Sequence, residues 1–122
     1  MIAIIGSRGQ LGWELVRQGE VRGEAMLAAD VGEIDITAEA SVAGCFKEQP
    51  IEAVVNAAAY TAVDRAESEP EAAFAVNCDG PQNLARYCRA AGAGLIHVST
   101  DYVFDGSQKR PYTESDPVSP IG

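Results

Sequence analysis

Three glycines near the start of the chain have the spacing of a phosphate-binding loop. Gly6, Gly9 and Gly12 follow the apolar run MIAII and precede a segment with helical periodicity. Glycine lets backbone amides approach a phosphate, and the N-terminus of the next helix favours an anion. The pattern is GxxGxxG, not GxGxxG, so the loop alone fits a phosphate cradle and a purely structural tight turn equally well.

An acidic residue favours a dinucleotide at this loop. Asp30 ends the apolar segment AMLAAD and follows Gly12 by 18 residues. This separation suits a carboxylate that accepts hydrogen bonds from the adenosine ribose, although a solvated turn residue is the alternative. Asp30 favours NAD because it would repel a 2′-phosphate, whereas Arg8 could pair with that phosphate. The residues predict an NAD or NADP site, with a slight preference for NAD.

The elements that must position these residues alternate between strand and helix. We expect strands at 1–5, 25–30, 52–59 and 95–100, and helices at 10–22, about 38–48 and about 69–91. Thr37 is the expected N-cap of the second helix, and the pair at 80–81 is expected to interrupt the third. This order predicts an α/β fold, a Rossmann-like doubly wound parallel sheet with helices on both faces.

Composition excludes several kinds of partner. The 122 residues carry a net charge of -9 with no basic stripe, which argues against nucleic acid and anionic lipid. No apolar run approaches 18 residues, and no basic segment precedes the first strand, so neither a membrane span nor a signal peptide is expected. Three cysteines without a CxxC pair predict reduced thiols in a cytoplasmic protein, and no cluster of ligands assigns a metal.

Longer segments of the chain resemble a known family. NAAAYTAVDRAESEPEAAFAVN at 56–77 and STDYVFDG at 99–106 resemble the dTDP-4-dehydrorhamnose reductases, extended short-chain dehydrogenases that reduce a 4-keto nucleotide sugar. The resemblance also includes GQLG at 9–12, DI at 35–36, GPQNLA at 80–85 and PYTESDPVSP at 111–120. It therefore extends over essentially the whole chain, and it is far more specific than the glycine loop.

The resemblance implies a cofactor site built from several loops. It implies that Asp35 and Ile36 contact the adenine and that small side chains at 57–59 let the cofactor cross the sheet edge. The alternatives are that Asp35 caps the next helix and that the alanines only allow close packing. The expected cofactor-binding residues are Gly6, Arg8, Gly9, Gln10, Leu11, Gly12, Asp30, Asp35, Ile36, Ala57, Ala58, Ala59 and Tyr60.

The resemblance also implies which residues bind the substrate. Thr100 matches the hydroxyl that hydrogen-bonds the reacting carbonyl, and Asp101 matches a substrate contact beside it. Thr61 and Val63 are expected near the meeting point of nicotinamide and sugar. The alternatives are that Thr100 satisfies a backbone group at the strand end and that 60–63 is ordinary surface. His97 is expected to be a core histidine.

The family's proton-donating Tyr-x-x-x-Lys pair does not occur in this sequence. The four tyrosines are followed four places later by Asp64, Ala91, Gly106 and Asp116. In the family, tyrosine donates a proton to the carbonyl oxygen and lysine lowers the tyrosine pKa. We therefore expect residues 1–122 to be an incomplete NAD(P)-binding domain of a longer enzyme, inactive alone and self-associating as a homo-oligomer through an open sheet edge.

Two other functions stay open at this point. One is a related nucleotide-sugar reductase or epimerase with a different substrate. The other is a non-catalytic regulatory subunit on the same fold, like the regulatory subunit of methionine adenosyltransferase, which resembles these reductases.

Overall fold

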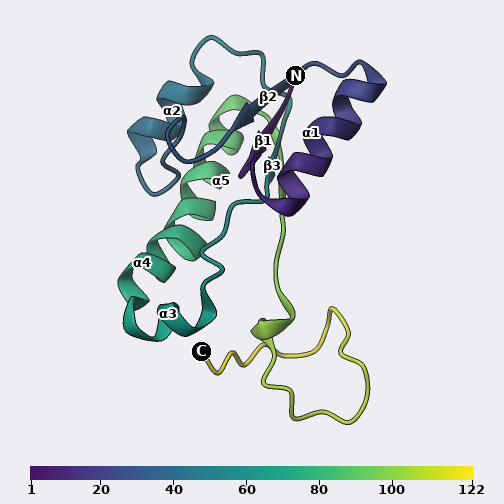
Figure 1. The fold of residues 1–122 in the computed structure, drawn as a ribbon, viewed down its shortest axis with the longest axis vertical. Coiled ribbons are helices and arrows are strands. Elements are labelled where there is room, and N and C mark those ends of the chain that lie inside the picture. Colours follow the sequence, from purple (N-terminus) through teal and green to yellow (C-terminus); the bar gives the residue numbers. More distant parts are fainter.

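The computed structural model describes residues 1–122, which form a four-stranded parallel sheet with helices on both faces. The strands are β1 (Ile2–Ile5), β2 (Met26–Ala29), β3 (Ala53–Asn56) and β4 (Gly94–His97), in the order β2-β1-β3-β4. Figure 1 shows the sheet nearly edge-on, with α1 (Gln10–Arg22) on one side and α2 (Glu39–Phe46) and α5 (Gly80–Ala91) on the other. The predicted doubly wound α/β fold is confirmed.

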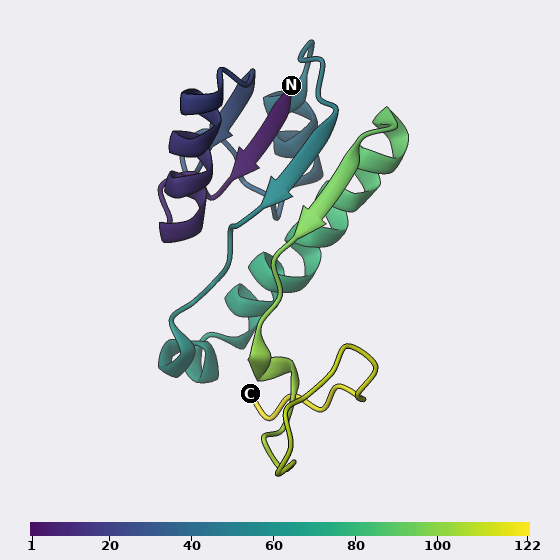
Figure 2. The same ribbon diagram turned by 90° about the vertical axis from the view of Figure 1, so that its right-hand side faces the viewer.

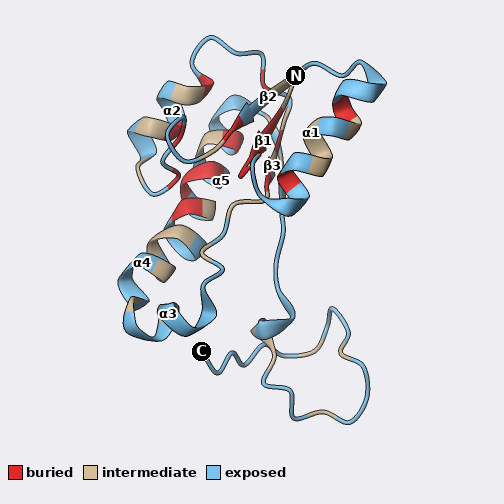
Figure 3. Ribbon diagram, in the orientation of Figure 1, coloured by how far each residue is buried: buried red, intermediate tan, exposed pale blue.

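The main core lies between the sheet and the α2/α5 layer. β1 is apolar throughout because helices cover both of its faces, and Ala3, Ile4 and Ile5 are all buried. Figure 3 shows the buried residues concentrated along the strands and the facing sides of these two helices. The core includes Ala3, Ile5, Val54, Val42, Phe46, Leu84 and Cys88. The rings of Phe46 and Tyr87 pack at a centroid distance of 4.7 Å, which joins α2 to α5.

The opposite face is covered less completely. α1 packs on β1 and β2 alone, so Ile96 on β4 is 60% exposed. His97 lies on the other face of β4, paired in register with fully buried Asn56, and is exposed at the end of the strand; its Nδ1 lies 3.1 Å from Asn56 Nδ2. Within residues 1–122 the expectation of a core histidine is therefore wrong, because β4 is an edge strand of this four-stranded sheet and leaves the imidazole open to solvent.

The expected long helix at 69–91 is formed from three pieces. α4 (Pro70–Phe74) leads into a π-helical turn (Ala75–Asp79), and α5 follows without a break. The Gly80 N–H donates to the carbonyl of Ala75, five residues back. Proline has no N–H to donate, so the widened turn accommodates Pro81 in the first turn of α5. The predicted interruption is thus a change of helical register just before 80–81.

Other departures from the predicted elements are local. α3 (Val63–Ser68) was not expected, and α2 begins after Ala38 with no side-chain cap, so the prediction of a Thr37 cap is wrong. After β4 the chain leaves the sheet, forms a 3₁₀ turn (Asp101–Val103) and continues as a long irregular segment (Figures 1 and 2). None of the helices combines the length and apolar character needed to cross a membrane.

Candidate functional site

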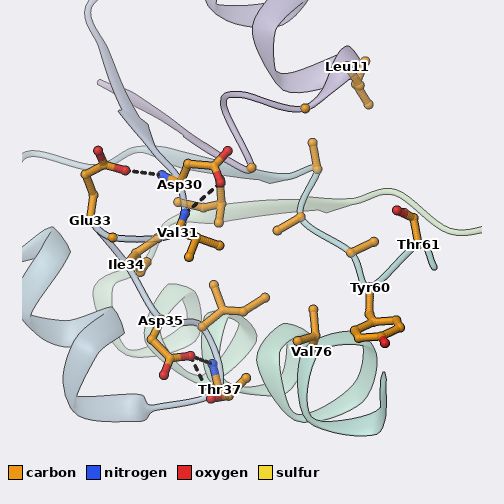
Figure 4. Close-up of a pocket in the computed structure, with 18 of the residues that line it drawn as sticks. Leu11, Asp30, Val31, Glu33, Ile34, Asp35, Thr37, Tyr60, Thr61 and Val76 are labelled. Carbon is orange, nitrogen blue, oxygen red and sulfur yellow. Dashed lines mark hydrogen bonds between the residues drawn. The ribbon is translucent and has the colours of Figure 1, made fainter. Parts of the chain in front are cut away.

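A cleft with a volume of about 990 Å³ opens at the carboxyl ends of β1, β2 and β3. Three segments form its walls, namely the glycine loop, residues 30–37 after β2, and residues 57–61 after β3. Figure 4 shows Asp30 and Glu33 on one side, with Tyr60 and Thr61 across the cleft. β2 and β3 flank β1 on opposite sides, so the cleft lies at the switch point where open α/β sheets bind ligands.

Close packing explains two of the three glycines in the loop. Gly6 has a φ of +80°, and a Cβ there would come within 2.7 Å of the Ala58 nitrogen. A Cβ on Gly12 would come within 2.7 Å of the Gly6 carbonyl carbon. Gly9 is more open, and a Cβ there would meet only the Gly6 oxygen, at 3.3 Å. Gly6 and Gly12 therefore hold the loop against β3 and α1, while Gly9 lines the cleft.

The N-terminus of α1 faces the cleft with unpaired donors. The N–H groups of Gln10 and Leu11 make no hydrogen bond within the chain, and both residues line the cleft. The helix has no side-chain cap at Gly9 and no acidic residue in its first turn. Free amides and the positive end of the helix dipole favour an anion at this position.

Asp30 is tied into the loop by backbone donors. Its Oδ2 accepts from the Arg8 N–H at 2.7 Å, and its Oδ1 accepts from the Val31 N–H at 2.7 Å. A carboxylate has about four lone-pair sites, so each oxygen can still accept a ligand hydroxyl. The Arg8 guanidinium does not line the cleft, since it donates to Glu33 and, at 3.2 Å, to the Val31 carbonyl.

The second wall is shaped around Asp35. Its Oδ1 accepts from the backbone N–H of Thr37 at 2.9 Å and from the Thr37 hydroxyl at 2.7 Å, which explains why Thr37 does not cap α2. Buried Asn83 on α5 donates to the carbonyls of Ile36 at 2.9 Å and Thr37 at 3.1 Å. One amide side chain therefore fixes the segment that carries Asp35 and Ile36.

The third wall is held by two asparagines. Fully buried Asn56 accepts from the Ala58 N–H at 3.1 Å, and Asn77 in the π-helical turn bonds the backbone of Tyr60. The Tyr60 hydroxyl donates to Glu69 Oε2 at 2.5 Å. This contact raises the pKa of Tyr60 above its ordinary value, and the same hydrogen bond lowers the pKa of Glu69.

The cleft brings most of the predicted cofactor residues together. The predicted residues that line it are Gly6, Gly9, Gln10, Leu11, Asp30, Asp35, Ile36, Ala57, Ala58, Ala59, Tyr60 and Thr61. Sequence reasoning missed Ile5, Val31, Gly32, Glu33, Ile34, Thr37, Ser41 and Val76. Most of these residues follow β2, at the same sheet edge as Asp30 and Asp35. Because residues 31–34 join these two predicted site residues, their position in the sequence could have indicated that they line the cleft.

Thr61 lines the cleft, but the other predicted substrate residues and Thr100 lie outside it. Val63 is 56% exposed at the start of α3, and Thr100 and Asp101 are exposed beyond β4. Thr100 Oγ1 lies 3.3 Å from Asp101 Oδ1 and accepts from the Tyr102 N–H at 3.2 Å. The threonine hydroxyl thus caps the 3₁₀ turn. No group of His, Cys, Asp and Glu side chains is arranged to hold a metal ion.

The chain is similar to proteins named dTDP-4-dehydrorhamnose reductase. The chain is 50% identical to a dTDP-4-dehydrorhamnose reductase of Streptomyces griseus over 96% of its own length and 38% of the relative's. A reductase structure from Clostridium acetobutylicum is similar, with 42% identity and a TM-score of 0.94 over 98% of this chain and 42% of that one. The chain therefore spans about 40% of the relatives that it matches.

A similar structure is a complex with a cofactor. The dTDP-4-dehydrorhamnose reductase of Bacillus anthracis, solved with NADP, has 34% identity and a TM-score of 0.93 over 98% of this chain and 43% of that one. The family model described as the RmlD substrate binding domain matches residues 1–122. Because this match extends over the whole chain, the chain belongs to the RmlD substrate binding domain family.

Proposed function

We propose that this chain is the NAD(P)-binding part of an enzyme that reduces dTDP-4-dehydro-L-rhamnose to dTDP-L-rhamnose with NADPH or NADH. The observation that carries the proposal is the uncapped N-terminus of α1, which faces a cleft beside the carboxylate of Asp30. The names of the relatives and the NADP complex of the Bacillus anthracis protein support it. The reaction belongs to deoxysugar synthesis for polysaccharides, and we assign the protein to the cytoplasm.

The residues of the cleft fit a dinucleotide. The free amides of Gln10 and Leu11 would bind the pyrophosphate, and Asp30 would accept the hydroxyls of the adenosine ribose. Asp35 and Ile36 would contact the adenine. The small side chains at 57–59 leave space for the cofactor to pass toward Tyr60. A bound reduced nicotinamide would supply hydride, and the chain's contribution is to orient it.

We place the substrate beyond β4. The Thr100 hydroxyl would donate to the carbonyl oxygen of the sugar, and Asp101, Thr61 and Val63 would contact the nucleotide sugar. In the chain alone this hydroxyl lies within 3.3 Å of the Asp101 carboxylate, so the substrate carbonyl would replace an existing neighbour. None of the four tyrosines has a lysine four places later, so we assign the proton donor to a part of the enzyme outside 1–122.

Calorimetric titration of residues 1–122 with NADH and NADPH tests the cofactor site. We expect both to bind, and we expect Asp30→Asn to weaken NADH because a neutral amide accepts the ribose hydroxyls less strongly than a carboxylate. Asp64→Asn is the matched control, because it makes the same charge change on α3, away from the cleft. Failure of the unaltered chain to bind either dinucleotide at millimolar concentration would contradict the proposal.

A turnover assay tests the division of roles. We expect no reduction of dTDP-4-dehydro-L-rhamnose by this chain with either cofactor, because it lacks the Tyr-x-x-x-Lys pair. Measurable turnover would place the proton donor inside 1–122. Size-exclusion chromatography tests self-association through exposed Ile96 and the free edge of β4, and a stable monomer would contradict it.

A further inference from the structure

The positive charge in the glycine loop is already paired. The Arg8 guanidinium donates through Nη2 to Glu33 Oε1 and through Nη1 to the Val31 carbonyl at 3.2 Å. Glu33 is fixed in this position, since its Oε2 accepts from the Asp30 N–H at 3.0 Å and its own N–H donates to the Asp30 carbonyl at 2.9 Å. Arg8, Asp30 and Glu33 therefore form a closed cluster at the end of β2.

The charge of this cluster matters for one chemical difference between the two dinucleotides. NAD has a 2′-hydroxyl on the adenosine ribose, and NADP has a phosphate there. Two carboxylates, Asp30 and Glu33, oppose one guanidinium, so the cluster as a whole repels a phosphate. A hydroxyl carries no charge and can donate to Asp30. The cluster of Arg8, Asp30 and Glu33 therefore favours binding of NAD over binding of NADP.

We propose that Glu33 sets the cofactor preference of this chain, favouring NAD over NADP by holding Arg8 away from the 2′-phosphate. This inference rests on the proposed function, because it assumes that the ribose lies beside Asp30. To bind a 2′-phosphate, the Arg8 guanidinium must leave Glu33 and pair with the phosphate. The Glu33 carboxylate is then unpaired and repels the phosphate. Glu33 lines the cleft, whereas the Arg8 side chain does not. Glu33 acts as a specificity-determining residue and takes no part in hydride transfer.

The test uses Glu33→Gln in residues 1–122. Glutamine retains an acceptor for the Asp30 N–H but removes the charge that holds Arg8. We expect the Kd for NADPH to fall roughly fivefold relative to that for NADH at low salt, the size expected of one partly exposed charge interaction. Glu24→Gln removes one negative charge outside the cleft and controls for net charge, and it should leave the ratio unchanged.

The Arg8→Gln background tests the coupling between the two residues. In this background only the direct repulsion between the Glu33 carboxylate and the phosphate remains to be removed, so Glu33→Gln should change the ratio clearly less than it does with Arg8 present. An unchanged ratio in Glu33→Gln, or an equal change in the Arg8→Gln background, with NADH binding intact, would overturn the role of Glu33. Loss of binding of both dinucleotides by the unaltered chain would instead refute the proposed function, and this inference with it.

Discussion

The side-chain amide of Asn77 bonds both backbone polar groups of Tyr60. Its Oδ1 accepts from the Tyr60 N–H at 2.8 Å, and its Nδ2 donates to the Tyr60 carbonyl at 3.1 Å. Asn77 lies in the π-helical turn that precedes α5, seventeen residues along the chain from Tyr60. The helical region therefore fixes the loop that forms the third wall of the cleft.

Replacing Asn77 with alanine should loosen this wall. We expect Asn77→Ala to lower the free energy of unfolding by about 1 kcal/mol, because the site is exposed and water replaces the two hydrogen bonds in part. We expect a larger effect on the Kd for NADH than on stability, because the loop carries Tyr60 and Thr61. Urea unfolding and calorimetry measure the two quantities. An affinity equal to that of the unaltered chain would show that Asn77 does not position the wall.

A methyl group on Gly12 should disrupt the loop. Gly12→Ala would force the Gly6 carbonyl to move, because the new Cβ would lie within 2.7 Å of the Gly6 carbonyl carbon. We expect a loss of about 1–3 kcal/mol in the free energy of unfolding, together with weaker NADH binding. Gly44 on α2 is a matched control with nothing within 4 Å of its Cβ position. Gly44→Ala should raise stability by about 0.5–1 kcal/mol, so destabilisation by both variants would contradict the packing argument.

The contact between Tyr60 and Glu69 should appear in a pH titration. The pKa of Tyr60 is raised and that of Glu69 is lowered, mainly by their shared hydrogen bond. The stabilisation is therefore present between the ordinary values of about 4.5 and 10.0, and it is lost as pH falls through the lowered Glu69 pKa or rises through the raised Tyr60 pKa. Glu69→Gln should return the Tyr60 pKa toward 10.0.

Phenolate absorbance measures this shift, and the difference from a Tyr60→Phe variant isolates Tyr60 from the other three tyrosines. A Tyr60 titration that is the same in the unaltered chain and in Glu69→Gln would exclude the carboxylate as the cause.

Buried Asn83 should be important for stability as well as for the site. Asn83→Ala would leave the carbonyls of Ile36 and Thr37 without their donor, and we expect it to cost about 2–3 kcal/mol in the free energy of unfolding. Gln82→Ala alters the exposed neighbour on the same helix and should stay within about 0.5 kcal/mol of the unaltered chain. Chemical unfolding followed by circular dichroism compares the two. Equal effects would mean that the hydrogen bonds to the segment carrying Asp35 contribute little.

The sheet could be predicted from the sequence because strands and helices are set by residues close together in the chain. The apolar run at 1–5 had to be a strand covered on both faces, and the periodicity at 10–22 gave α1 with its bounds. The alternation of elements then required parallel strands, whose carboxyl ends meet at one edge. That constraint placed Gly9 and Asp30 around one cleft, and the family resemblance added Asp35 to it.

The contacts that hold the site depend on residues distant in the chain. Nothing local indicates that Asn83 bonds the carbonyls of Ile36 and Thr37, or that Glu33 binds Arg8. Likewise, His97 belongs to an apolar strand, yet within residues 1–122 it is exposed because β4 is the edge strand of the four. The sequence by itself determined the order of elements and the sheet edge at which the cleft opens. The tertiary structure decided which polar groups are paired there, because hydrogen bonds between distant segments form only after the layers pack.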